Sequence, residues 1–148
     1  MKMIIASLSY LLLCSAGFAQ VHGSRPGISF QIKNAYDPVY EGTLTYLKKT
    51  GHEISTNNRE AGQIMTYPSV HNGMLMQVGF FIYVSFIREN KTTTTVNVEV
   101  EKVKRAAGNR GWASQKQDAE QTHKVEAELK EFLETSLASQ TDSHAKEP

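Results

Sequence analysis

Two long stretches of alternating apolar and polar residues dominate the centre of the chain. The first spans residues 78–86 and the second residues 92–103, with a polar turn at residues 88–91 between them. An alternation with a period of two residues is typical of β-strands that bury one face. Two such stretches joined by a short polar turn predict an antiparallel hairpin. Its apolar positions are Val78, Phe80, Ile82, Val84, Phe86, Val96, Val98 and Val100.

A helix is predicted before this hairpin, from Pro38 to about Lys49. Asp37 is a typical N-cap residue, and proline is favoured at the first helical position. Gly51 is typical of a helix end. A short alternating strand at residues 28–32 precedes this helix.

Two further short strands are predicted between the helix and the hairpin, at residues 52–56 and 62–67. Residues 69–74 follow as a turn, because they contain Asn72-Gly73, a strong turn signal.

The end of the chain predicts a second, amphipathic helix. Ser114 and Gln117 have the spacing of a capping box, and apolar residues then recur at helical spacing to about Leu137. Residues 138–148 are polar, and we expect them to form a disordered tail.

These elements predict an α+β fold in which an antiparallel four- to five-stranded sheet packs against two helices. The apolar faces of the two helices can pack against the apolar face of the sheet, so that both are buried in a two-layer sandwich. The length is that of one domain, which we place at residues 20–137.

The order of elements resembles the BamC-like helix-grip domains of small bacterial envelope proteins and lipoproteins. The resemblance runs from about Tyr36 to Leu137 and includes the strand start Glu60-Ala61-Gly62-Gln63-Ile64. It implies a helix-grip-like sandwich and a non-catalytic role in the envelope.

Residues 1–19 have the pattern of a cleavable signal peptide. Lys2 precedes an apolar run that is too short to span a bilayer, and small residues at Gly17 and Ala19 predict a cut before Gln20. The alternative is lipidation of Cys14, although Leu12 and Leu13 are larger than the residues usual before a lipidated cysteine. We therefore expect a periplasmic or secreted protein.

The charge of the remaining chain is balanced. Without Lys2, 15 basic residues stand against 15 acidic ones. This balance gives no general attraction to nucleic acid or anionic lipid. We expect no nucleic-acid partner, and membrane association only if Cys14 is lipidated.

No pattern of catalytic or metal-binding residues emerges, so we expect no enzyme activity, no metal and no cofactor. His123, Glu120 and Glu126 share a helical segment that is more simply a solvated face. The loop with Gly108, Gly111 and its neighbouring basic residues suggests anion binding or, more simply, a flexible basic loop.

Four aromatic residues are the candidate site. We expect them either to line a groove for a partner or ligand between the sheet and the long helix, or to belong to an ordinary core. They are Tyr67, Phe81, Tyr83 and Trp112.

The leading hypothesis is an exported, non-enzymatic binding or assembly module whose partner is another envelope protein. The alternative is a carrier that holds a small apolar ligand between helix and sheet. A hydrolase with a dispersed site is the third hypothesis.

Overall fold

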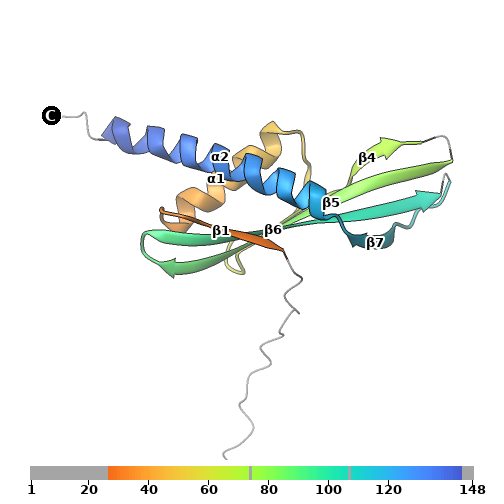
Figure 1. Ribbon diagram of the computed structural model, residues 1–148, viewed down its shortest axis with the longest axis horizontal. Helices are drawn as coiled ribbons and strands as arrows, with labels where there is room; N and C mark the ends of the chain where they lie inside the picture. The colour runs from red at the N-terminus through yellow and green to blue at the C-terminus, as the bar shows by residue number, and fades with distance from the viewer. Residues whose placement is uncertain (1–26, 74, 107, 145–148) are drawn as a thin grey trace, which may run out of the picture.

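The computed structural model describes residues 27–73, 75–106 and 108–144, which form one seven-stranded antiparallel sheet with two helices (Figure 1). The predicted signal peptide and Cys14 lie outside the described residues. The elements are β1 (Ile28–Ile32), α1 (Tyr36–Lys49), β2 (Ile54–Asn58), β3 (Gln63–Thr66), β4 (Ser69–Asn72), β5 (Met76–Asn90), β6 (Thr93–Ala106), β7 (Ala113–Gln117) and α2 (Ala119–His144).

The long strands β5 and β6 form the predicted hairpin and run through the whole sheet. Val84 lies opposite Val98 near the middle of this pair. In one half, β3 flanks β5 with β2 outside it, and β1 flanks β6; in the other half, β4 lies beside β5 and β7 beside β6. The two long strands therefore join two regions with different neighbours.

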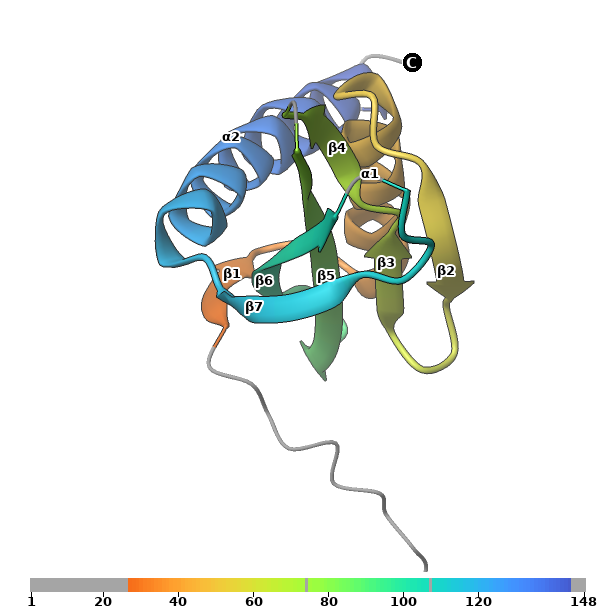
Figure 2. The same ribbon diagram turned by 90° about the vertical axis from the view of Figure 1, so that its right-hand side faces the viewer.

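Both helices pack on one face of the half of the sheet that contains β1, β2 and β3 (Figure 2). The even-numbered apolar residues of the hairpin share this face, and those at 82–86 and 96–100 are buried under the helices, so the predicted alternation is confirmed. Each fully buried side chain of this size contributes about 1.5–3 kcal/mol before entropy is subtracted. Core residues with at most 2 % exposure include Val39, Tyr40, Leu47, Ile64, Ile82, Val84, Val96, Val98, Val100, Leu129 and Leu133.

The first helix begins earlier than its sequence pattern predicts. It starts at Tyr36, and the residue at its N-cap, Ala35, makes no side-chain capping bond. Asp37 and Pro38 therefore lie inside the first turn, where proline is tolerated because the amide there has no helical partner. The predicted end is confirmed, since the helix stops before Gly51, which has a φ of 81°.

The two helices approach each other closely at Gly42. A Cβ atom at this position would lie 2.7 Å from Leu133 Cδ2. Glycine therefore allows α1 to pack against α2 at this point.

The sheet has more strands than the four or five expected, because β4 and β7 were missed. Residues Ser69–Asn72 pair with β5, and the predicted turn is confined to the residues around Gly73, whose N–H donates to the Met76 carbonyl. Residues Ala113–Gln117 pair with β6 instead of starting the last helix.

The second helix also has different ends from those expected. Asp118 is its capping residue in place of Ser114, since Asp118 Oδ1 accepts a hydrogen bond from the Gln121 N–H (3.0 Å). The helix continues to His144, so the expected start of an irregular tail at Ala138 is wrong for residues 138–144.

Candidate functional site

The sheet continues beyond the helices as four strands, which we call the extension (Figures 1 and 2). It comprises the described residues of 67–80 and 101–118, and thus β4, the start of β5, the end of β6 and β7. The remaining described residues, 27–66, 81–100 and 119–144, form the body. We call the sheet face that packs against the helices in the body the helix-side face.

Three lysines gather on the helix-side face of the extension. Lys102 and Lys104 follow Val100 on the same face of β6, and Lys116 lies directly opposite Lys102 on β7. Together with Gln117 and Asp118 they line a hollow of about 290 Å³. Like charges in directly opposite positions of two strands destabilise a sheet. This arrangement departs from the local rules of sheet stability, as functional sites often do.

Within the described part of the chain, these lysines have no neutralising partner close enough for an ion pair. The ion pairs described there join Arg59 to Asp37 and to Glu41, in the body. Lys102 Nζ lies 5.8 Å from the centre of the Phe80 ring, a cation–π contact that leaves its charge in place. The hollow therefore carries an excess of positive charge.

The start of α2 holds one side of this hollow in place. The Asp118 N–H donates to the Val100 carbonyl (2.8 Å), and the Val100 N–H donates to Thr122 Oγ1 (3.1 Å). Because Asp118 also caps the helix, its carboxylate already accepts a hydrogen bond from a backbone N–H. The junction between β7 and α2 is thus fixed on β6.

Apolar residues lie beside the lysines and at the far end of the extension. Phe80 and Val78 are opposite Lys102 and Lys104 on β5. Further along, Leu75 is 81 % exposed, and Met76 is also exposed. Val70 is exposed as well, but it pairs with Gly79 and lies on the opposite face of the extension. The extension therefore combines a basic hollow with an exposed apolar end.

The opposite face of the extension carries Trp112, which packs on Gly79. A Cβ atom on Gly79 would lie 3.2 Å from Trp112 Cη2 and 2.9 Å from Pro68 Cβ, so glycine is needed there. The Arg105 guanidinium lies 4.4 Å from the centre of the Trp112 ring, and Arg105 Nε donates a hydrogen bond to Gln77 Oε1. This packing fixes the loop between β6 and β7 on the sheet.

The predicted aromatic groove does not lie between the sheet and the long helix. Phe81 and Tyr83 alternate with the core residues of β5 and so share the opposite face, with ring centres 6.1 Å apart. Trp112 lies over Gly79 of that same face, and Tyr67 is 51 % exposed. The expected position was wrong because alternation separates these residues from the helix-side core. Their role toward a partner stays a prediction.

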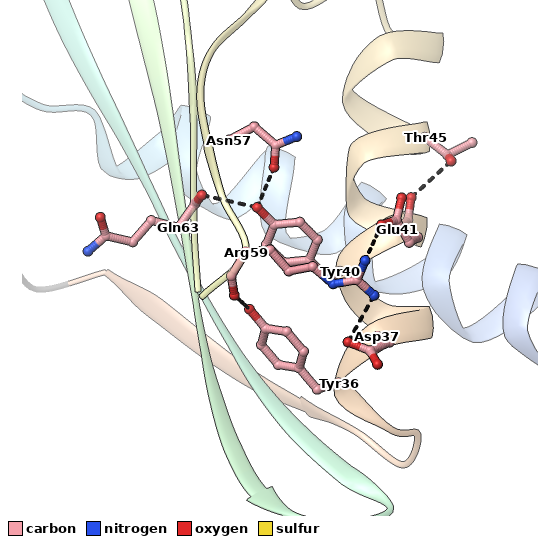
Figure 3. Close-up of polar contacts among 8 residues, drawn as sticks. All are labelled: Tyr36, Asp37, Tyr40, Glu41, Thr45, Asn57, Arg59 and Gln63. Atoms are coloured by element: carbon pink, nitrogen blue, oxygen red, sulfur yellow. Dashed lines mark hydrogen bonds and ion pairs between the residues drawn. The ribbon is translucent and has the colours of Figure 1, made fainter. Parts of the chain in front are cut away.

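A second cluster of polar groups links the start of α1 to the turn between β2 and β3 (Figure 3). Arg59 in that turn pairs with Asp37 (2.9 Å) and Glu41 (3.2 Å). The Tyr36 hydroxyl donates to the Arg59 carbonyl, and the Tyr40 hydroxyl donates to Asn57 Oδ1. Because these groups satisfy one another, we interpret the cluster as a structural link.

Burial raises the pKa of both tyrosines in this cluster above the usual value. Both hydroxyls therefore remain protonated donors at neutral pH. The same region has a hollow of about 550 Å³ beside the turn at residues 60–62, where Arg88 stacks 4.1 Å from the Tyr36 ring. Its charged residues, Glu60 and Arg88, have opposite signs. It should therefore attract a charged partner less strongly than the lysine hollow does.

The basic residues near the glycine-containing loop lie on β6 and on the loop that follows it. Arg105 belongs to the end of β6, and Arg110 lies in the loop before β7. Within the described ranges, no three histidine, cysteine or acidic side chains come close enough to hold a metal ion. In the same part of the chain, neither helix has both the length and the apolar composition needed to cross a bilayer.

Sequence reasoning missed the lysine hollow as a site. The sequence groups Lys102 and Lys104 with the basic residues before the loop of Gly108 and Gly111, whereas the capping-box spacing of Ser114 and Gln117 predicts that Lys116 belongs to the last helix. The sequence pattern does not indicate strand β7, and it is the pairing of β7 with β6 that places Lys116 opposite Lys102.

Comparison with known proteins gives little further information. No family model matches the chain, and no curated protein matches it. Among solved structures, it is similar to a TBP-like protein from Parabacteroides distasonis ATCC 8503, with 9 % identity and a TM-score of 0.34. The match covers 60 % of this chain and 64 % of the other. A likeness at this level carries no functional argument, and the resemblance to BamC-like domains stays a prediction.

Proposed function

We propose that this protein is an exported, non-enzymatic binding or assembly module of the cell envelope, which attaches to an acidic partner through its extension. Export is supported by the signal-peptide pattern of residues 1–19. In this proposal the body is a helix-grip-like sandwich that acts as a rigid base for the extension.

The observation that supports this function is the direct pairing of Lys102 with Lys116. Register places the two residues directly opposite each other and both line the same hollow, to which Lys104 adds a third charge on the same face. Holding these charges together opposes folding. An acidic partner would remove the repulsion, because its negative charges would neutralise the lysines.

The packing of the body favours surface binding over carriage of an apolar ligand. Leu129 and Leu133 of α2 have 0 % exposure, and so does Val98 of β6. Core side chains thus occupy the region between α2 and the sheet where the sequence suggested a ligand. The two hollows described above lie elsewhere, at the extension and beside the β2–β3 turn.

The test uses envelope membranes, with their proteins, isolated from cells that express the protein. The wild-type chain should sediment with them, and the triple variant Lys102→Gln, Lys104→Gln, Lys116→Gln should lose most of this binding. The matched control, Lys33→Gln, Lys48→Gln, Lys91→Gln, removes the same charge from exposed positions of the body. It should bind like wild type. Equal loss in both variants, or no binding by wild type, would contradict the proposal.

A further inference from the structure

We infer that the acidic partner of the extension is the surface of an anionic lipid bilayer, into which the end of the extension inserts. This inference rests on the proposed function, because it names the partner of the same site. The balanced net charge of the whole chain predicts no general attraction to anionic lipid. The inference concerns the extension alone, where basic residues are concentrated.

The shape of the molecule allows this contact. The extension projects past the start of α2, away from the helices, and the end of β4 and the start of β5 lie at its far end (Figure 1). A flat surface can therefore meet this end without touching the body. A deep binding cleft is not required.

The end of the extension exposes apolar residues beside the turn signal Asn72-Gly73. Leu75 exposes 81 % of its surface and Met76 exposes 47 %. Val70, on the adjacent edge strand β4, exposes 40 %. Side chains of this kind gain free energy when they enter the boundary between lipid headgroups and acyl chains. Leu75 and Met76 lie together at this protruding end and fit an insertion point, with Val70 further back on β4.

Basic residues lie behind this apolar end, on β6, on β7 and on the loop before β7. The extension carries five basic residues against two acidic ones, and the lysines of the hollow lack ion-pair partners among the described residues. Each basic residue near an anionic surface strengthens binding about fivefold. The basic residues are Lys102, Lys104, Arg105, Arg110 and Lys116.

The body has the opposite charge. Residues 27–66, 81–100 and 119–144 include 8 basic and 12 acidic residues. An anionic surface therefore attracts the extension and repels the body, which favours one orientation. This separation of charge favours a lipid surface over a small acidic protein, since a whole plane acts on both regions at once.

Lipid vesicles of defined composition test the inference. The chain starting at Gln20 is used, because it contains every described residue and lacks the apolar segment 4–14, which would itself bind lipid. It should sediment with vesicles of phosphatidylcholine and phosphatidylglycerol and not with phosphatidylcholine alone. Added salt should weaken this binding, because it screens the attraction.

Trp112 is the one tryptophan of the chain and gives a direct reading of insertion. It lies in the loop between β6 and β7, within the extension. Binding to the anionic vesicles should shift its emission to shorter wavelength. Lipids brominated on their acyl chains should quench it if the extension is the part that enters the bilayer.

Two variants and two controls locate the contact. Leu75→Ser with Met76→Ser should weaken vesicle binding about tenfold or more, because it removes the inserted apolar groups. Lys102→Gln with Lys116→Gln should weaken it by a similar factor. Ile87→Ser and Lys91→Gln change an exposed apolar and an exposed basic residue at the other end of the hairpin, and neither should alter binding. Circular dichroism of each variant checks the fold.

The outcomes separate this inference from the proposed function. Absent or lipid-independent vesicle binding would overturn the inference, as would equal losses in the controls. If envelope membranes then still bound the chain through its lysines, the partner would be an acidic protein and the proposed function would stand. Failure of the envelope test would remove both.

Discussion

The body and the extension share the strands β5 and β6, yet the two regions use the same alternation differently. In the body, Val84 pairs with Val98 under both helices. In the extension, Phe80 pairs with Lys102 on the same face, where the hollow is open. Alternation therefore shows which residues share a face, whereas the neighbouring elements determine whether that face becomes a core or a contact surface.

The largest expected difference between the two regions is in sensitivity to truncation. Leu133→Ala in the body should lower the free energy of unfolding by about 2–5 kcal/mol, because it leaves a cavity at a fully buried position. Val78→Ala in the extension should lower it by about 1 kcal/mol, because Val78 is only half-buried. Urea unfolding measures both. Equal losses would show that the extension is packed like the body.

Two glycines with positive φ offer the next comparison. Gly62→Ala should destabilise the body by about 2–3 kcal/mol, because φ is +63° and a Cβ would lie 2.9 Å from the Phe86 carbonyl oxygen. Gly108→Ala in the extension has φ +85° with open space around it, so we expect about 1 kcal/mol from strain alone. Thermal unfolding of both variants tests this order. A larger effect at Gly108 would contradict it.

A smaller effect of opposite sign is expected at the lysine hollow. Lys116→Gln removes the like charge opposite Lys102, so it should stabilise the fold by about 0.2–1 kcal/mol. The gain should shrink at high salt, because screening already reduces the repulsion. Lys91→Gln, in the turn at the other end of the hairpin, serves as the control. A loss of stability in Lys116→Gln would mean that its ammonium has a favourable role in the folded chain.

The smallest effect should be a pH dependence that originates in the body. Burial lowers the pKa of His52, while the Glu128 carboxylate partly opposes this shift. The unfolded chain then binds a proton more readily than the folded one, so stability should fall as the pH decreases through about 6.5. It should level off once the folded histidine is also protonated.

Buried Nδ1 of His52 has no hydrogen-bond partner in the described structure, which agrees with a neutral ring. His52→Gln should therefore flatten the dependence of stability on pH in this range. Unfolding curves of the two chains at several pH values provide the measurement. An unchanged slope in the variant would assign the pH dependence to another group.

Sequence reasoning was most successful where burial imposes a long, regular pattern. The hairpin and the apolar stripe of the last helix follow from periods of two and 3.6 residues, and both are confirmed. The first helix was predicted with a start at Pro38, although Tyr36 and Asp37 already belong to it. A residue type that favours the N-cap can thus lie inside the first turn. Here Asp37 forms an ion pair with Arg59 instead of capping the helix.

The elements of the extension were harder to predict because their signals are not local. Residues 113–117 lack the β-branched and aromatic side chains that favour strands, and they form β7 at the edge that β6 provides. The short strand β4 was hidden beside the turn signal Asn72-Gly73. The lysine pair depends on the register between β6 and β7, which no pattern within either strand specifies.

The uninterrupted course of β5 and β6 from the core to the far end has a consequence for how the contact surface can change. Core packing near Val84 and Val98 fixes the strand alignment, and the same alignment assigns each distant side chain to its face. Inserting one residue between Phe80 and Ile82 without a bulge would reverse the orientation of the outer part of β5. The composition of the surface would hardly change, but Val78 and Phe80 would leave the side of the lysines. Evolution of this surface is therefore restricted to exchanging residues in place, to inserting them in pairs, or to single insertions that a bulge absorbs, such as the register shift between Lys102 and Val103.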